Sequence, residues 1–305
     1  MAPKTSKARA SEAEPLASRT RPSAIEAIPE ALFHSCTRTW FDEAFASPTK
    51  VQLASWPALF ARESALLLAP TGSGKTLAAF LAAIDRLMFG RPQLKTEEDR
   101  KAQAGVKVIY ISPLKALGVD VDRNLRAPLA GISAVAAREG VAHYPVTVGI
   151  RSGDTESRER SRMLRHPPDV LITTPESLYL MLTSRARDIL RSVETVIVDE
   201  IHTMVSTKRG AHLFVSLERL EALRSQNAAT AGSETQTVQR IGLSATQRPL
   251  DEVARLLGGY EFRQAEGEPV ERPVNIIDAS EKRPFELTIC MPLGDQVDQA
   301  ADEFN

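Results

Sequence analysis

The segment Ala69–Thr76, with the sequence A-P-T-G-S-G-K-T, constrains the fold of this chain more than any other segment. It follows the short apolar run Ala65–Leu68, and a helical pattern begins at Leu77. Glycines at positions 72 and 74 permit a tight turn that directs several backbone N–H groups at one phosphate, where the positive end of the helix dipole also points. A strand, a phosphate-binding loop and a helix in this order predict an α/β fold with a ligand site at a strand end.

This loop (P-loop) supplies the groups that hold a nucleoside triphosphate. Lys75 is expected to reach the β- and γ-phosphates, and the Thr76 hydroxyl is expected to be a ligand of Mg²⁺. The usual pattern, G-x-x-x-x-G-K-[ST], begins with glycine, whereas this chain has Ala69 there. An ordinary glycine turn is the alternative, because G-K-[ST] alone also occurs by chance. The residues predicted to bind the nucleotide are Thr71, Gly72, Ser73, Gly74, Lys75 and Thr76.

Composition is consistent with such a domain and excludes several classes of protein. The 305 residues are 43% hydrophobic and 25% charged, which provides ample material for a core. The net charge of −1 gives no support for a strongly basic nucleic-acid-binding domain, so phosphate contacts would need a local patch. Two distant cysteines exclude a disulfide framework and suit a reducing cytoplasm. No apolar segment approaches a membrane span, and residues 1–28 are expected to form a disordered tail.

Short apolar runs alternate with helical patterns along the rest of the chain. Several runs are continuous in Val, Ile and Leu, as in strands buried on both faces of a parallel sheet. The expected strands are 65–68, 106–111, 146–150, 170–173, 195–198, 240–243, 274–277 and 285–290. The expected helices are 77–89, 113–125, 155–164, 175–182, 210–224 and 249–257, with a surface insertion at 91–104 and a flexible loop at 225–239. The alternation predicts a doubly wound α/β layer whose ligands bind at the carboxyl ends of the strands.

Asp199, Glu200 and His202 follow a buried apolar run in the sequence D-E-I-H. Two carboxylates at the tip of a buried strand are costly to desolvate unless a cation meets them, and Mg²⁺ carried by a triphosphate is such a cation. We therefore expect Asp199 to hold the metal and Glu200 to orient and deprotonate the attacking water. The alternative is a solvated loop. The next apolar strand ends in S-A-T, where the hydroxyls of Ser244 and Thr246 are expected to hydrogen-bond to His202 or to the carboxylates.

The P-loop, D-E-I-H and S-A-T, in this order and at strand ends, resemble the first RecA-like domain of superfamily 2 helicases. The segment S-P-L-K-A-L at 112–117 resembles motif Ia, T-T-P-E-S at 173–177 resembles motif Ib, and R-S-G-D-T at 151–155 is similar to a DNA-contact loop of these enzymes. The stretches H-P-P-D-V-L-I-T-T-P-E-S-L-Y-L-M-L-T-S and S-T-K-R-G-A-H-L closely resemble the large helicase-related (Lhr) proteins, which are ATP-dependent DNA helicases. The resemblance runs from about residue 30 to about residue 280.

The resemblance implies ATP and Mg²⁺ as cofactors and nucleic acid as a partner, with DNA taken from the family. It implies that Gln52 reads the adenine, and a carboxamide suits that task because it offers a donor and an acceptor together. It also implies contacts along the backbone of one nucleic-acid strand, made by Lys115, Arg151, Thr174 and Glu176. The arginines that follow Arg151 form a local basic cluster, although such a run is usually a solvated helix face.

The resemblance covers one lobe of a two-lobed motor. The second lobe of these helicases supplies arginine to the transition state through Q-x-x-G-R-x-x-R, a motif that this sequence does not contain. We expect a helicase ATP-binding domain at 29–262 and, at 263–305, a linker with the start of a second lobe. That lobe would act in cis or in trans, and this chain alone would hydrolyse ATP weakly. Two other functions stay open, a non-catalytic nucleotide- or nucleic-acid-binding module and an unrelated P-loop enzyme for a small molecule.

Overall fold

The computed structural model describes the backbone of most of the segment 28–280. The parts outside the described residues are 1–27, 93–95, 97, 100–102, 114, 232–235, 246–248, 262–267 and 281–305, together with the side chains of 115–120, 123 and 227–231. The predicted strand at 285–290, nearly all of the predicted tail, and Thr246 therefore lie outside the described residues. Ile28, the last residue assigned to that tail, is buried in the core.

Strands and helices alternate along the chain, as the hydrophobic pattern predicts. The strands are β1 (Ala65–Leu68), β2 (Val108–Ile111), β3 (Val148–Arg151), β4 (Val170–Thr173), β5 (Thr195–Val198), β6 (Gln239–Ser244), β7 (Tyr260–Glu261), β8 (Val270–Glu271) and β9 (Asn275–Asp278). The helices are α1 (Ser35–Ala44), α2 (Lys50–Phe60), α3 (Lys75–Phe89), α5 (Lys115–Arg138), α6 (Ser157–Arg165), α7 (Pro175–Leu182), α8 (Lys208–Ala231) and α9 (Leu250–Gly258), with the short 3-10 helices η1 (Arg185–Leu190) and η2 (Ile201–Thr203).

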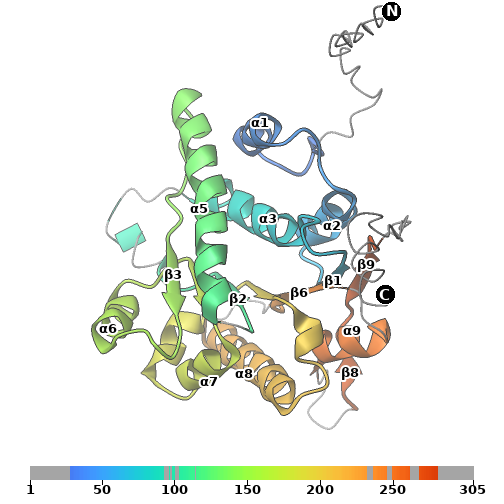
Figure 1. Ribbon diagram of the computed structural model, residues 1–305. Helices are drawn as coiled ribbons and strands as arrows, with labels where there is room; N and C mark the ends of the chain where they lie inside the picture. Colours follow the sequence, from blue (N-terminus) through green and yellow to red (C-terminus); the bar gives the residue numbers. More distant parts are fainter. Residues whose placement is uncertain are drawn as a thin grey trace, which may run out of the picture.

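Within the described residues, seven strands form one parallel sheet in the order β3-β4-β2-β5-β6-β1-β9 (Figure 1). The inner strands are buried along their whole length, which explains their continuous apolar sequences. The edge strands β3 and β9 are partly exposed, and β7 pairs with β8 in a separate antiparallel hairpin. The predicted parallel α/β fold is confirmed. Because the strands are parallel, all their carboxyl ends lie at the same edge of the sheet.

Helices cover both faces of this sheet, with α1, α2, α3 and α5 on one side and α7, α8 and α9 on the other (Figure 1). Neighbouring strand residues point to opposite faces, so that Leu67 packs in the first core and Leu66 in the second. The first core also contains Trp56 of α2 and Tyr110 of β2, and the second contains Leu217 of α8. None of the helices in the described residues is long and apolar enough to span a bilayer.

Several element boundaries differ from the sequence-based expectations. Helix α5 continues through Pro128 to Arg138, past the end expected at residue 125. Proline is unfavourable inside a helix, so the sequence indicated an end before it, but this helix tolerates Pro128. Helix α8 continues to Ala231, into the segment expected to be a flexible loop, where alanines favour a helix. Strand β9 lies beyond residue 262, where we placed the end of the domain, yet it pairs along β1. The sheet therefore extends to Asp278.

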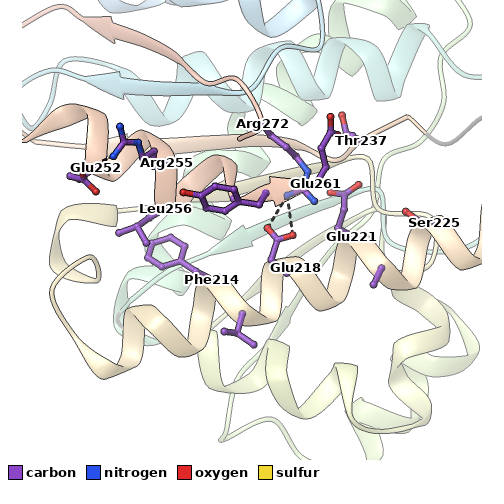
Figure 2. A pocket seen from close by; sticks show the side chains of 14 residues that line it. Phe214, Glu218, Glu221, Ser225, Thr237, Glu252, Arg255, Leu256, Glu261 and Arg272 are labelled. Carbon is purple, nitrogen blue, oxygen red and sulfur yellow. Dashed lines mark hydrogen bonds and ion pairs between the residues drawn. The ribbon is translucent and has the colours of Figure 1, made fainter. Parts of the chain in front are cut away.

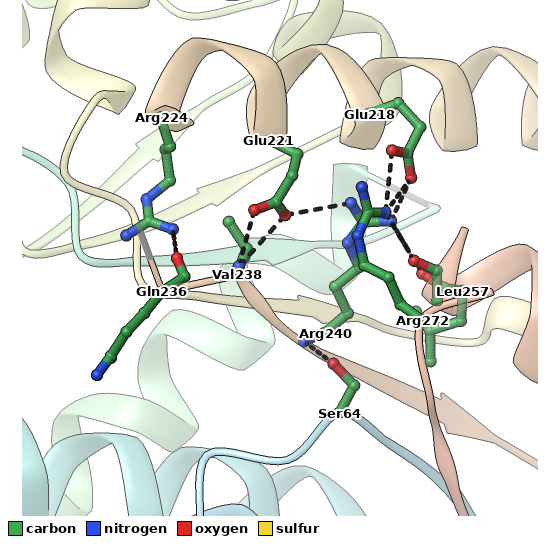
Figure 3. Close-up of polar contacts among 10 residues, drawn as sticks. Ser64, Glu218, Glu221, Arg224, Gln236, Val238, Arg240, Leu257 and Arg272 are labelled. Carbon is green, nitrogen blue, oxygen red and sulfur yellow. Dashed lines mark hydrogen bonds and ion pairs between the residues drawn. The ribbon is translucent and has the colours of Figure 1, made fainter. Parts of the chain in front are cut away.

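A buried charge network joins β6 to α8 and α9 (Figure 3). The Arg240 guanidinium is 2% exposed and donates to Glu218 at 2.7 Å, to Glu221 at 3.3 Å and to two backbone carbonyls at the end of α9. Arg272 also donates to Glu218, at 2.8 Å and 3.0 Å. Burial alone would raise the pKa of Glu218, but the hydrogen bonds from Arg272 and Arg240 hold it below its ordinary value.

Candidate nucleotide and nucleic-acid site

The loop between β1 and α3 has the backbone conformation that its glycines predict. Gly72 has φ 79° and Gly74 has φ 86°, which is the left-handed region that side chains disfavour. A Cβ at Gly74, the N-cap of α3, would lie 2.7 Å from Nε2 of Gln52. Thr71 and Gly72 are exposed, while Oγ of Ser73 is buried without a hydrogen-bond partner among the described residues. An unpaired hydroxyl beside the free N–H groups of a helix start fits a bound phosphate.

Lys75 is the first residue of α3 and is 8% exposed. Its ammonium donates to the backbone carbonyls of Ala69 and, at 2.9 Å, of Pro70. Burial lowers the pKa of Lys75, and the carboxylates of Glu200 and Asp199 act in the opposite direction. The ammonium therefore lies within the field of both carboxylates. A phosphate would compete for this cation with two neutral carbonyls, and hydrogen bonds between charged groups are roughly twice as strong as neutral ones.

Gln52 lies against the phosphate loop and is 3% exposed. Its Oε1 accepts from the Thr49 N–H at 2.9 Å, which completes a capping box at the start of α2, and its Nε2 donates to the Gly74 carbonyl at 3.4 Å. The carboxamide thus links α2 to the loop, a contact that the sequence pattern did not predict. The described residues engage one N–H and one lone pair of the carboxamide, and the predicted adenine contact would use the other N–H and the other lone pair.

Asp199 and Glu200 directly follow β5. The Asp199 N–H donates to the Ile111 carbonyl at 2.9 Å, and the Asp199 carboxylate accepts from the Glu200 N–H at 3.0 Å and from the Tyr110 hydroxyl. Burial and the adjacent Asp199 raise the pKa of Tyr110, so its hydroxyl stays protonated and donates. Glu200 has φ 45° and ψ 42°, a left-handed conformation that is unfavourable for a non-glycine residue. Strain of this kind suggests a functional side chain.

His202 connects the D-E-I-H segment to the end of β6. Its Nδ1 lies 3.2 Å from Oε2 of Glu200 and 3.4 Å from Oγ of Ser244, which is 1% exposed. The contact between His202 and Ser244 that the motif order predicts is present. When Nδ1 carries a proton it can donate to Glu200 or to the Ser244 hydroxyl, and when it does not it can only accept, from Ser244.

Strand order brings these segments together. Strands β1 and β5 both pair with β6, and all three are parallel, so that the loop after β1, Ser244 and Asp199 lie at one edge. The Ala69 N–H donates to the Ser244 carbonyl at 3.3 Å and ties the loop to β6. In open parallel sheets, ligands bind in the crevice outside the carboxyl ends of the strands, which is where these groups meet.

The residues predicted to contact nucleic acid follow β2, β3 and β4 at the same edge. Lys115 begins α5, and its side chain lies outside the described residues. Thr174 is 5% exposed, and its hydroxyl caps α7 by accepting from the Ser177 N–H at 3.4 Å. Glu176 forms two hydrogen bonds with Arg209 of α8, and this partner lowers the pKa of Glu176 to about 2. The side chains of Thr174 and Glu176 therefore already have partners within the protein.

Arg151, the last residue of β3, has a different environment. It is half-buried, and its buried Nη1 has no hydrogen-bond partner among the described residues. Burial and the nearby Arg160 guanidinium both lower the pKa of Arg151. Arg160 donates through Nη2 to the Gly153 carbonyl at 2.7 Å, while its Nε is likewise unpaired. Two neighbouring guanidiniums with unpaired N–H groups favour an anion such as a phosphate.

The oxygen donors near the phosphate loop fit Mg²⁺. Thr76 offers a half-buried hydroxyl and Asp199 a carboxylate, and Mg²⁺ is usually held by one or two carboxylates together with substrate phosphates. In the described part of the chain, no group of three or more His, Cys, Asp or Glu side chains is arranged to hold a metal by itself. The residues therefore fit an ion that arrives with a nucleotide.

A cavity of about 830 Å³ lies between α8, α9 and the β7–β8 hairpin (Figure 2). Phe214 and Leu256 form an apolar part of its wall, and Glu218, Glu221 and Arg272 of the charge network form a polar part. No residue that we predict to bind nucleotide or nucleic acid lines this cavity. It borders the residues around the start of β6, whereas the nucleotide site lies at the end of that strand.

A family model decides the membership of this chain. The model described as DEAD/DEAH box helicase matches residues 49–253, a segment that begins just before Gln52 and includes the P-loop, D-E-I-H and S-A-T. The chain belongs to the DEAD/DEAH box helicase family. Membership excludes the alternative of an unrelated P-loop enzyme for a small molecule.

The curated relatives of this family member include Lhr helicases. The Lhr helicase/probable uracil glycosylase of Mycolicibacterium smegmatis is 50% identical over 269 residues, which are 88% of this chain and 16% of that protein. The ATP-dependent helicase Lhr-Core of Methanothermobacter thermautotrophicus is 41% identical over 273 residues, which are 89% of this chain and 29% of that protein. The chain thus spans less than a third of the length of these relatives.

Solved helicase structures share the fold. The structure of Mycobacterium smegmatis helicase Lhr bound to ssDNA and AMP-PNP is similar, with a TM-score of 0.68, 50% identity, and coverage of 82% of this chain and 28% of that chain. The DEAD-box helicase Mss116 bound to ssRNA and UDP-BeF has a TM-score of 0.61 at 15% identity, and the match covers 83% of this chain and 44% of that chain. At this identity the likeness shows the fold alone. The predicted RecA-like fold and the resemblance to Lhr helicases are confirmed.

Proposed function

We propose that this chain is the ATP-binding lobe of an Lhr-like ATP-dependent DNA helicase, and that it binds Mg²⁺-ATP and single-stranded nucleic acid at the carboxyl edge of its sheet. The observation that carries the proposal is that the phosphate loop, which holds Lys75, and the carboxylates of Asp199 and Glu200 follow the two strands that flank β6, so that they meet at one edge of the sheet. The likeness to an Lhr structure bound to ssDNA and AMP-PNP supports it.

The residues of the site divide the chemistry of ATP hydrolysis between them. The loop N–H groups, the Ser73 hydroxyl and Lys75 bind the β- and γ-phosphates. Thr76 and Asp199 would hold Mg²⁺, which when bound neutralises phosphate charge. Glu200 orients the attacking water and accepts its proton. Gln52 reads the adenine, and His202 and Ser244 couple the carboxylates to the end of β6.

Strand order suggests where the nucleic acid lies. The nucleotide site occupies the ends of β5, β6 and β1, whereas Arg151 and Arg160 lie at the end of the outermost strand on the other side, β3. Strand β5 is central to the sheet and separates the two regions, so that D-E-I-H borders both. We propose that a single strand crosses this half of the edge. Its phosphates would contact Arg151 and the N–H groups at the start of α5, near Lys115, and the strand would pass the start of α7, near Thr174 and Glu176.

A second RecA-like lobe, in cis or in trans, would supply arginine to the phosphates, so we expect this chain alone to hydrolyse ATP weakly. Strand β9 is the last strand of the described lobe. A cytoplasmic location is part of the same proposal, since two distant cysteines suit a reducing compartment.

Nucleotide binding is tested by titrating the chain with a fluorescent ATP analogue in the presence of Mg²⁺. Lys75→Ala should weaken the affinity at least about tenfold, because it removes a charged hydrogen-bond donor of the kind that contributes about 1.5–3 kcal/mol. Lys208→Ala is the matched control, since Lys208 is exposed at the start of α8 and should leave the affinity unchanged. Undiminished affinity of a folded Lys75→Ala variant would refute the assignment of the phosphate loop.

A further inference from the structure

Tyr110 is a buried residue of β2 that no sequence motif singles out. Its side chain is fully buried, and its hydroxyl donates to Oδ2 of Asp199 on the neighbouring strand end. Its ring stacks on Phe80 of α3, with ring centroids 5.0 Å apart and an interplanar angle of 26°. One side chain thus touches both the helix that begins at the phosphate loop and the carboxylate assigned to the metal.

The hydrogen bonds to Asp199 fix the direction of its carboxylate. Oδ1 accepts from the Glu200 N–H at 3.0 Å, and Oδ2 accepts from the Tyr110 hydroxyl. Each carboxylate oxygen has about two acceptor positions, and the described residues occupy one on each oxygen, which leaves the other for a metal-bound water or a metal ion. With both oxygens held, the plane of the carboxylate cannot rotate freely, and partners that orient a metal ligand in this way raise metal affinity.

We propose that Tyr110 is a positioning residue for the metal-binding carboxylate of Asp199, and that its stacking on Phe80 holds this carboxylate at a fixed position relative to the phosphate loop. Because Asp199 is assigned to the metal only in the proposed function, the role of Tyr110 rests on that proposal. The ring of Tyr110 packs in the core, where a phenylalanine would fit equally well. The hydroxyl, in contrast, contacts the Asp199 carboxylate of the candidate site.

The test measures how Mg²⁺ strengthens nucleotide binding in Tyr110→Phe, which keeps the ring and removes the hydroxyl. A fluorescent AMP-PNP analogue is titrated at a series of Mg²⁺ concentrations and in EDTA. The Mg²⁺ concentration that gives half of the gain in affinity should rise about tenfold, the lower end of the range for residues that orient metal ligands. The affinity in EDTA should change less than about twofold, because the phosphate loop is intact. Electron paramagnetic resonance of Mn²⁺ bound with AMP-PNP should show the same weakening, without any dependence on hydrolysis.

Tyr260→Phe is the matched control, because it removes an exposed hydroxyl that contacts Glu271 at 3.3 Å on the β7–β8 hairpin. Its Mg²⁺ dependence should equal that of the parent chain. Phe80→Leu removes the stacking partner but keeps the Tyr110 hydroxyl, and it should shift the Mg²⁺ dependence in the same direction by a smaller factor. If Tyr110→Phe does not fold, Phe80→Leu carries the test, and an unchanged Mg²⁺ dependence there overturns the role.

The outcomes separate this role from the proposed function. Parental Mg²⁺ dependence in a folded Tyr110→Phe variant would overturn the positioning role and leave the nucleotide site standing. An equal loss of affinity in EDTA and in Mg²⁺ would overturn it as well, since that result shows a packing role. If nucleotide binding by the parent chain does not depend on Mg²⁺, the proposed metal site fails and the role of Tyr110 fails with it.

Discussion

Glu200 combines an unfavourable backbone conformation with a carboxylate at the edge of the sheet. At φ 45° an L-residue with a side chain costs about 1–2 kcal/mol more than it would in the right-handed region, and glycine would avoid that cost. The left-handed turn places Oε2 of Glu200 3.2 Å from Nδ1 of His202, and the Glu200 N–H donates to Oδ1 of Asp199 at 3.0 Å. Strain at a single residue whose side chain lies among polar groups supports a chemical role for that side chain.

Glu200→Gln should therefore retain nucleotide and lose hydrolysis. Glutamine keeps the shape of the side chain but is not a base, and general bases contribute about 10²–10⁴ in rate. We expect the affinity for Mg²⁺-ATP to stay within about threefold of the parent and phosphate release to fall by about a hundredfold or more. Glu252→Gln, an exposed carboxylate on α9, is the control. Parental turnover in Glu200→Gln would show that Glu200 is not the base.

A site residue can be predicted from the sequence when it belongs to a short motif, but not when its role depends on a contact with a distant residue. Lys75, Glu200 and Ser244 could be predicted because short motifs at strand ends place their groups at one edge of a parallel sheet. Tyr110 was not found, because a tyrosine within an apolar run is typical of a core position, and its partner is 89 positions away. The pair Glu176 and Arg209 was missed for the same reason, since contacts between elements have no characteristic spacing.

At the scale of elements, strand order decides how the candidate site is divided. Periodicity predicted parallel strands but not their order, because order is set by the crossovers between strands. In the observed order, β3, β4 and β2 lie on one side of β5, and β6, β1 and β9 lie on the other. The turn after β3 places the unpaired guanidinium of Arg151 at the outer end of the edge. The basic run in α6 is otherwise exposed, except where Arg160 bonds to the turn.

Arg151→Ala should weaken binding of single-stranded DNA and reduce its salt dependence. Each phosphate contact to a single strand contributes about 0.7 to the slope of log K against log salt concentration, so the loss of one contact should lower that slope by about 0.7. Fluorescence anisotropy of a labelled oligonucleotide between low and moderate salt measures both quantities. Arg158→Ala, an exposed arginine on α6, should leave the slope unchanged. An unchanged slope in Arg151→Ala would remove this residue from the nucleic-acid path.

At the scale of the whole molecule, β6 makes polar contacts to other elements of the described lobe at both of its ends. Ser244 ends the strand at the nucleotide site, and Arg240 near its start joins α8 and α9 through the charge network (Figure 3). The sequence predicted the two helices and the strand but not the network, because a buried arginine in an apolar strand has no pattern that indicates its partners. The strand at 274–277 was predicted, but its pairing with β1 was not, because a short strand beyond two glycines resembles part of a linker and we placed it outside the domain.

Breaking this network should cost stability without touching the nucleotide site. Arg240→Met removes the ion-pair partner of Glu221, which is 8% exposed, and breaking a buried ion pair from one side typically costs about 3–5 kcal/mol. We expect a loss near the lower end of that range in the free energy of unfolding by urea, because Glu218 is partly exposed and keeps Arg272. Arg255→Met, which breaks exposed pairs, should cost about 1 kcal/mol or less.

The double variant Arg240→Met with Glu221→Gln distinguishes the charge from the packing. Removing the orphaned carboxylate should recover part of the loss, since the cost of breaking a buried pair lies mainly in the charge left behind. The folded single variant should still bind nucleotide, because Arg240 and Ser244 lie at opposite ends of the same strand. If Arg240→Met were no more costly than Arg255→Met, the network would be incidental to the fold. The packing of α8 and α9 against β6 would then be stabilised by the apolar core that contains Leu217 and Leu257.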